Sequence, residues 1–173
     1  MILKKITLLI NLILFTSGLL VLKGAMAQEK AMLPGQLQKL VPDNINGYNH
    51  DEEVKGKLMQ IGNLQYSFCE HRFSKKNQNI KVLLFDYKEA PVMFNQVTKG
   101  WNAYEPVDSD SIILRSVIQP HVAGWESYQR ASNSSQVKLT INSRFFLNIA
   151  GENVDLEVLK EVLSHFDFEK FPK

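Results

Sequence analysis

Cysteine is almost absent from this chain: Cys69 is the only one among 173 residues. One cysteine cannot form an intramolecular disulfide, so the fold must depend on its hydrophobic core. Catalytic signatures are missing as well, since the sequence has no nucleotide-binding glycine pattern, no nucleophile elbow and no helical zinc motif. The length fits one domain that can bury a sizeable core. We therefore expect one core-stabilised domain and no enzymatic activity.

An excess of basic charge is also lacking once the N-terminal residues are set aside. The chain has 20 Lys and Arg against 18 Asp and Glu, but Lys4, Lys5 and Lys23 all precede the first acidic residue. Without these three lysines, 17 basic residues face 18 acidic ones, a net charge of −1. Such a chain has no global basic surface for nucleic acid, so we expect no nucleic-acid partner.

Residues 1–27 have the pattern of a secretory signal peptide. Two lysines precede the apolar run Ile6–Leu22, and Ala25-Met26-Ala27 offers small residues at the positions a signal peptidase reads. The alternative is an uncleaved membrane anchor, because the run approaches the roughly 17 residues of a short spanning helix. Asn11 and Thr16–Gly18 weaken that alternative. We predict cleavage, a mature domain over residues 28–173, a periplasmic or secreted location, and membrane contact only through an uncleaved leader.

The clearest structural pattern lies near the C-terminus. Apolar and polar residues alternate over Val137–Ile141 and again over Arg144–Ala150, which predicts two strands joined by a tight turn. We expect Gly151 to end the second strand. The period then becomes helical, with Asn153 as the expected N-cap. The apolar face of this helix would contain Leu156, Leu159, Val162, Leu163 and Phe166.

The preceding residues predict further strands and two helices. Strands are expected at Gln65–Phe73, Ile80–Tyr87, Ser111–Ile118 and Val122–Arg130, with an edge strand around Lys57–Ile61. A short helix is expected over Gln36–Val41, and another opens at Ala90–Pro91 with Phe94, Val97 and Trp101 on one face. The order predicts an α+β fold in which helices pack on a mainly antiparallel sheet.

Two groups of residues could carry chemistry but have simpler interpretations. Cys69 and His71 share one strand face, so a thiol and imidazole pair is conceivable, although both residue types are also common in cores. A metal could be held by the loop residues His50, Asp51, Glu52 and Glu53, or by His71 with His121. Neither set has the spacing of a known metal site. We predict no metal and no other cofactor.

Three strand carboxylates, Glu70, Asp86 and Glu126, need partners if they are buried, and Arg72 and Arg144 are the expected ones. Acid catalysis would require two of these carboxylates to line one cleft, so we favour structural ion pairs.

Aromatic residues form the last candidate set. Tyr66, Trp101, Trp125 and Tyr128 could line a groove that binds a sugar, a peptide or an apolar ligand, or they could pack in the core. We take these four as the candidate ligand-binding residues.

The sequence also carries a family-like pattern: Tyr66-x3-Glu70-x2-Phe73, Asp86-Tyr87, Gly124-Trp125-Glu126-Ser127-Tyr128, and Arg144-Phe145 with Gly151 before a terminal helix. It resembles a group of uncharacterised secreted bacterial proteins, and the arrangement is similar to the Mog1/PsbP-like fold, including the DcrB-type and LpqN-type envelope proteins. The resemblance implies an αβα sandwich that binds or scaffolds and does not catalyse. It implies no particular functional residues.

We therefore expect a non-enzymatic periplasmic binding or accessory protein. It would act through a surface groove on a small ligand, or dock onto an envelope protein complex. The alternative is a metal-dependent or thiol hydrolase that uses Cys69, His71 and nearby carboxylates.

Overall fold

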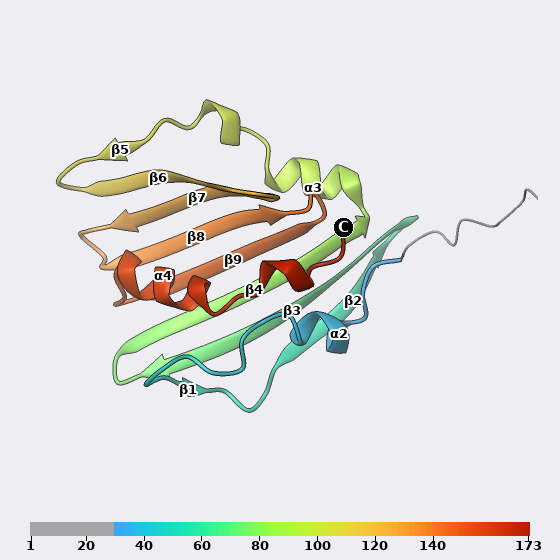
Figure 1. Cartoon of the computed structure of the whole chain (residues 1–173), viewed down its shortest axis with the longest axis horizontal. Coiled ribbons are helices and arrows are strands. Elements are labelled where there is room, and N and C mark those ends of the chain that lie inside the picture. The colour runs from blue at the N-terminus through green and yellow to red at the C-terminus, as the bar shows by residue number, and fades with distance from the viewer. Residues whose placement is uncertain (1–29) are drawn as a thin grey trace, which may run out of the picture.

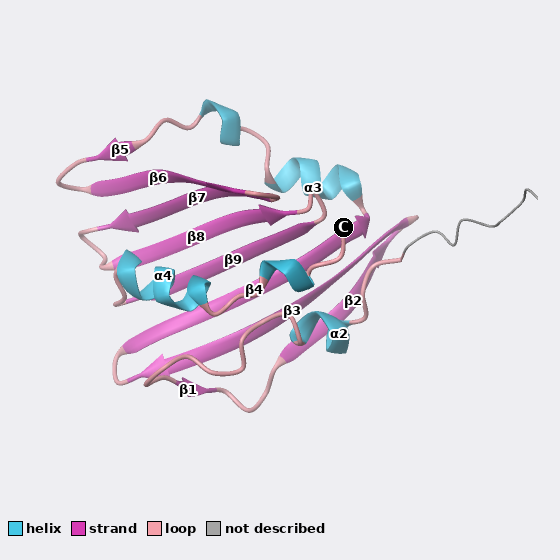
Figure 2. Ribbon diagram, viewed as in Figure 1, coloured by secondary structure: helices cyan, strands magenta, loops and turns pink. Residues whose placement is uncertain are grey.

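The structure is a computed structural model and describes residues 30–173. The predicted signal peptide lies outside the described residues. All strands belong to one antiparallel sheet with the order β1-β3-β4-β9-β8-β7-β6-β5, and β2 also pairs with β3 (Figure 1). The α+β prediction, a mainly antiparallel sheet with few helices, agrees with this architecture (Figure 2).

Seven of the nine strands within the described residues lie close to the predicted bounds, and the two-residue strands β1 and β5 were not predicted. The strands are β1 (Asn49–His50), β2 (Lys55–Ile61), β3 (Leu64–Lys75), β4 (Gln78–Glu89), β5 (Val107–Asp108), β6 (Ile112–Gln119), β7 (Val122–Gln129), β8 (Ser134–Ile141) and β9 (Phe145–Glu152). The helices are α2 (Pro34–Gln38), α3 (Pro91–Val97) and α4 (Leu156–Ser164), with two 3₁₀ turns, η1 (Trp101–Ala103) and η2 (Phe168–Lys170). Within residues 30–173, no helix combines the length and hydropathy that a membrane crossing requires.

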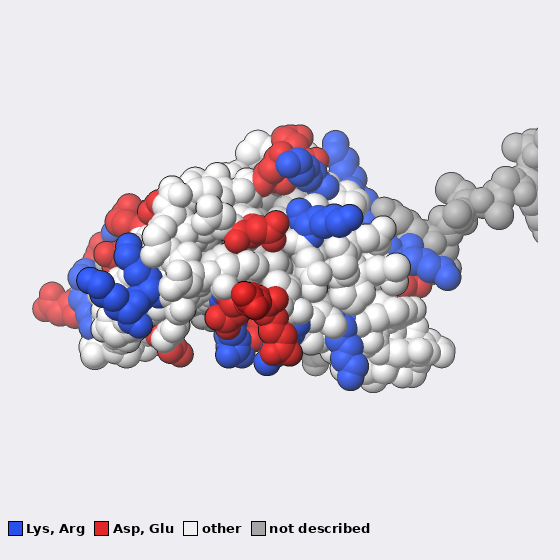
Figure 3. All heavy atoms as spheres, turned by 90° about the horizontal axis from the view of Figure 1, so that it is seen from below, with Lys and Arg blue, Asp and Glu red and all other residues white. Residues whose placement is uncertain are grey.

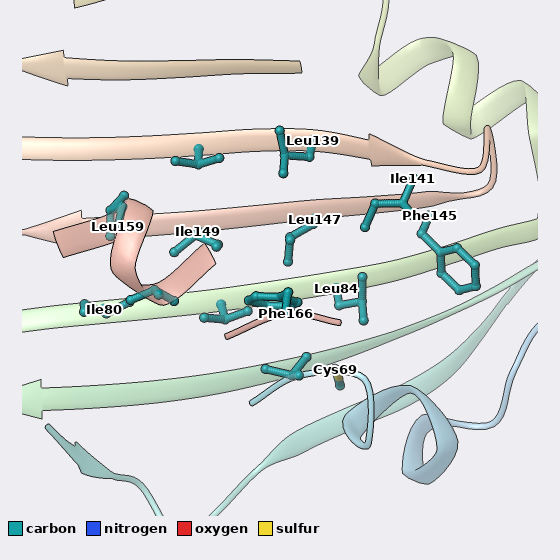
Figure 4. Packing of buried hydrophobic residues seen from close by; sticks show 14 of the residues in the cluster. Cys69, Ile80, Leu84, Leu139, Ile141, Phe145, Leu147, Ile149, Leu159 and Phe166 are labelled. Carbon is teal, nitrogen blue, oxygen red and sulfur yellow. The ribbon is translucent and has the colours of Figure 1, made fainter. Parts of the chain in front are cut away.

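One face of the sheet, which we call the core face, holds the hydrophobic core. Alternate residues of the central strands point into it, because side chains of a strand alternate between the two faces. Helices α2 and α4 lie over this face (Figure 1) and add Leu37, Leu159 and Val162 to the cluster. Figure 4 shows the strand residues beneath them, among them Leu84, Leu139, Leu147 and Ile149. The opposite face is called the outer face below.

The start of α4 differs from the sequence prediction. Its N-cap is Asp155, whose side chain accepts a hydrogen bond from the Val158 backbone N–H at 3.0 Å. Asn153 has a left-handed backbone with φ of 57° and donates its side-chain amide to the Asn77 carbonyl, so it cannot act as the cap. Gly151 does not end β9 but pairs with Ser135 on β8. A glycine is needed there because a Cβ would lie 2.8 Å from the Ser135 hydroxyl oxygen.

Helix α3 is shorter than predicted. It ends at Val97, and Gly100, with φ of 86°, turns the chain before Trp101 starts a separate 3₁₀ turn. The loop that follows also contains the two-residue strand β5, which the sequence did not indicate.

Two predicted ion pairs are confirmed. Asp86 and Arg144 are both buried and form a two-point contact, with N–O distances of 2.8 and 2.7 Å. Asp86 also accepts a hydrogen bond from the Met32 backbone N–H, so the pair fastens the N-terminal segment to the sheet. On the outer face, Arg72 contacts Glu70 at 2.6 Å. Acidic and basic side chains are interspersed over the side of the molecule in Figure 3, with no patch of one sign covering it.

Candidate functional site

The outer face carries aromatic side chains from several neighbouring strands. They come from the strand positions that alternate with the buried core residues, and nearly all of them are half-buried. The set consists of Tyr66 and Phe68 on β3, Phe85 and Tyr87 on β4, Phe146 on β9 and Trp125 on β7.

These rings contact one another across the strands. Phe85 lies 5.7 Å from Phe68 and 6.0 Å from Phe146 between ring centroids, and Tyr87 lies 5.4 Å from Tyr66. Such distances are typical of favourable aromatic pairs. Tyr87 is the most buried member, and burial raises the pKa of its hydroxyl to about 12. The outer face therefore has an ordered aromatic layer.

Residues 91–108, which we call the connector, cross this layer. The connector places Phe94 against Tyr87 of β4, with ring centroids 6.5 Å apart. Trp101 then lies 6.1 Å from Phe146 of β9. Further along, Tyr104 packs edge-on against Trp125 of β7 at 5.5 Å. Each contact involves a different strand, so three aromatic residues hold the connector on the outer face.

The solvent side of the connector is unusually apolar. Val92, Val97, Tyr104 and Val107 are 65%, 37%, 48% and 41% exposed, and they are four of the eight exposed large apolar residues found within residues 30–173. A concentration of exposed apolar side chains typically marks an interaction surface. We refer to these four side chains, with the acidic residues Glu105 of the connector and Asp110 just after it, as the connector surface.

Three of the four predicted ligand-binding residues lie on the outer face. Tyr66, Trp101 and Trp125 take part in the contacts above. Tyr128 does not join them, because it lies three residues after Trp125 on β7 and so points to the opposite face. Its hydroxyl donates to the Asn133 side chain at 2.8 Å. Strand alternation alone could have excluded Tyr128. Phe94 and Tyr104, which the candidate set omitted, complete the layer.

Cys69 and His71 both lie on the core face, but they do not pair. Cys69 is fully buried, and burial raises the pKa of its thiol to about 12. The Nδ1 atom of His71 lies 3.1 Å from Nε2 of His50, and the two rings are parallel. Burial, together with the neighbouring His50, lowers the pKa of His71 to about 4. A protonated thiol and an imidazole engaged with another residue do not provide a nucleophile and its base.

The other chemical candidates are dispersed. Among residues 30–173, no three His, Cys, Asp or Glu side chains lie close enough to hold a metal ion. His50 does meet His71, whereas His121 lies in the turn between β6 and β7. The three strand carboxylates also separate. Glu70 is on the outer face and Asp86 on the core face, while two strands lie between Asp86 and Glu126. No two of them line one cleft.

Three cavities of the described part of the chain lie away from the aromatic layer. One is at the turns beside His121 and Asn142, another is at the β3–β4 end of the sheet, and a third lies beside α4. None of the three is lined by an aromatic residue of the outer face. The outer face presents a layer of contacting rings from neighbouring strands, a surface that suits contact with a large partner.

Comparison of the chain with protein-family models, with curated proteins and with solved structures found no match.

Proposed function

We propose that this protein is a non-enzymatic accessory protein of the bacterial envelope, periplasmic or secreted, that docks a partner protein on the connector surface. The observation that carries the proposal is the grouping of Val92, Val97, Tyr104 and Val107 on one segment. In a monomeric domain these side chains would stay in water at a cost, whereas a partner protein could bury them.

The aromatic layer supports this function because it holds the docking segment in place. Phe94, Trp101 and Tyr104 each contact a ring on a strand of the sheet, so the exposed side chains between them start from an ordered backbone. A preorganised surface loses less conformational entropy on binding than a free loop. Trp and Tyr are also the residue types that contribute most binding energy in protein interfaces.

The charged residues of the connector surface indicate which charge the partner's surface should carry. Asp108 in the connector is occupied by Arg115 and Arg130, at 2.9 and 3.4 Å. Glu105 and Asp110 are exposed, and neither has an ion-pair partner within residues 30–173. We therefore expect the partner to present an apolar strip bordered by Lys or Arg, which complements these two carboxylates.

The fold fits this role. We propose that it is of the Mog1/PsbP-like type, an αβα sandwich whose DcrB-type and LpqN-type representatives are envelope proteins. In support, α2 and α4 pack on the core face while α3 contacts the outer face through Phe94.

Site-specific photocrosslinking in the native host tests the docking. A photoreactive phenylalanine would replace Val92 or Val97 in the full chain, and Leu33 or Ile61, which are similarly exposed apolar residues outside the connector, in the controls. We expect one envelope protein to be crosslinked from the connector positions only. The adduct should disappear when Glu105→Lys is added, because this change opposes a basic partner.

Three outcomes would overturn the proposal: equal crosslinking from the control positions, adducts that contain only a second copy of this chain, or adducts that contain only lipid. Circular dichroism of each variant would confirm that the exposed substitutions leave the fold intact.

A further inference from the structure

A separate groove lies on the core face, between helix α4 and the strands β6 and β7. We call it the α4 groove. It has a volume of about 440 Å³. Its walls are mainly apolar and include Val117 of β6, Leu163 of α4, and Phe166 and Phe168 of the segment after α4, while Glu126 of β7 and Lys160 of α4 supply charge. An apolar cavity of this size with a few converging polar groups is typical of a small-molecule site.

Glu126 is the unusual member of this groove, because it is only 7% exposed and its carboxylate accepts no hydrogen bond from any residue within 30–173. Two cations approach its Oε1 atom, Lys160 Nζ at 3.7 Å and Arg115 Nη1 at 4.0 Å, and both distances exceed that of a hydrogen bond. Both cations make their short contacts elsewhere, Lys160 with Glu157 and Arg115 with Asp108, each at 2.9 Å.

Lys160 and Arg115 make their short contacts with exposed carboxylates, although the largely buried carboxylate of Glu126 would gain more from them. Glu157 and Asp108 are well exposed and could be hydrated by water, yet they hold the nearby cations. Glu126 is largely shielded from water, with 7% of its surface exposed, and holds neither cation at hydrogen-bond distance. A buried carboxylate without donors is costly, and a ligand that brings a donor removes that cost.

We infer that the α4 groove binds a small amphipathic ammonium compound, with its alkyl or aryl body against Val117, Leu163 and Phe168 and its primary ammonium donating to Glu126. An ammonium is favoured over a hydroxyl because hydrogen bonds between two charged groups are about twice as strong as neutral ones. A ligand with an anionic head would instead place a second negative charge beside Glu126.

The site is independent of the connector surface. Glu126 and α4 belong to the core face, whereas the connector lies against the outer face. A negative result at the α4 groove would leave crosslinking from Val92 and Val97 unchanged, so failure of one proposal can be told from failure of the other.

Three compounds that share a phenylalkyl group and differ in their polar group test the inference: 4-phenylbutylamine, 4-phenylbutanol and 4-phenylbutyrate. Each is titrated into the purified mature protein by calorimetry. We expect the amine to bind at least tenfold more tightly than the carboxylate, with the alcohol between them. Methyl NMR signals of Val117 and Leu163 should shift with the amine, because both residues line the groove.

Two substitutions should act in opposite directions. Glu126→Gln keeps the shape but removes the charge, and should weaken the amine at least tenfold. Lys160→Met removes the ammonium that competes for Glu126, and should tighten the amine severalfold. Glu161→Gln, an exposed change on the same helix, is the matched control and should have no effect.

The inference is overturned if the carboxylate probe binds as well as the amine, or if none of the three probes binds. It is also overturned if a folded Glu126→Gln variant retains full amine affinity. If that variant does not fold, two other measurements decide the question. They are the relative affinities of the three compounds for the unmodified protein and the amine affinity of the Lys160→Met variant.

Discussion

His71 should make the stability of this protein fall in mildly acidic solution. The side chain is 1% exposed, and its Nε2 atom has no hydrogen-bond partner among the described residues. Burial and the neighbouring His50 on β1 lower the pKa of His71 from 6.5 to about 4, and Asp43 in the preceding loop opposes this only in part. The folded protein therefore keeps His71 neutral over a range in which the unfolded chain binds a proton.

The sign and size of the effect follow from proton linkage. Above pH 6.5 neither state binds the proton and stability is complete, and as the pH falls toward 4 the unfolded state gains the proton first. The free energy of unfolding should therefore decrease by about 2 kcal/mol at pH 5 and by about 3 kcal/mol at pH 4 from this one group. Below pH 4 both states bind the proton and the penalty stops growing.

Chemical denaturation of the wild type and a His71→Leu variant at pH 7.5, 6, 5 and 4.5 would measure this penalty. The other ionisable groups are present in both proteins, so the difference between the two pH profiles reports on His71 together with its contact to His50. We expect the variant to lose less stability between pH 7.5 and 4.5, by about 2 to 3 kcal/mol. His121→Asn is the matched control, since His121 is exposed and its φ of 62° suits asparagine. Parallel profiles for wild type and His71→Leu would refute the reasoning.

Three further predictions concern the core. Asp86→Asn removes the buried carboxylate that pairs with the Arg144 guanidinium and should lower the free energy of unfolding by about 3 to 5 kcal/mol. The apolar double variant Asp86→Leu with Arg144→Met should cost less, and urea unfolding measures both. Gly124→Ala should prevent folding or destabilise the protein severely, because the added Cβ would lie 1.9 Å from a backbone oxygen of β8. Gly35→Ala is the control and should leave the thermal melt almost unchanged, because no atom lies within 4 Å of its added Cβ. Cys69 should resist alkylation at pH 8 in the folded protein and react fully in denaturant, since its pKa is raised to about 12; rapid labelling of the folded protein would contradict its buried position.

Most strands could be read from the sequence because one face of the sheet is buried. Strand β8 alternates strictly, with Val137, Leu139 and Ile141 buried between polar residues, and that period is a local property of the chain. Errors arose where a distant residue decides the local structure. Asn153 is a good N-cap by composition, but it lies in a left-handed turn and bonds to Asn77, which is remote in the sequence.

The candidate site was less predictable for a similar reason. Alternation places Tyr66 and Trp125 on their strands, and it could have shown that Tyr128 points the other way. It does not reveal that the connector returns over the outer face, since the contacts of Trp101 with Phe146 and of Tyr104 with Trp125 are tertiary. The exposed side of the connector carries no periodic signal at all.

Some buried polar groups on the core face have several partners and stabilise the fold, whereas others have few partners and can serve another role. Asp86 and Arg144 have several partners each, so their burial is explained by the anchoring of the N-terminal segment. His71 is equally buried, but its Nε2 atom has no partner among the described residues, and Glu126, which is 7% exposed, has only the two long ion pairs with Lys160 and Arg115. His71 lines none of these three cavities, and we expect its unpaired Nε2 atom to affect the pH dependence of stability. Glu126 lines the α4 groove, where a ligand can reach it, and an incompletely bonded carboxylate at an accessible apolar surface favours binding.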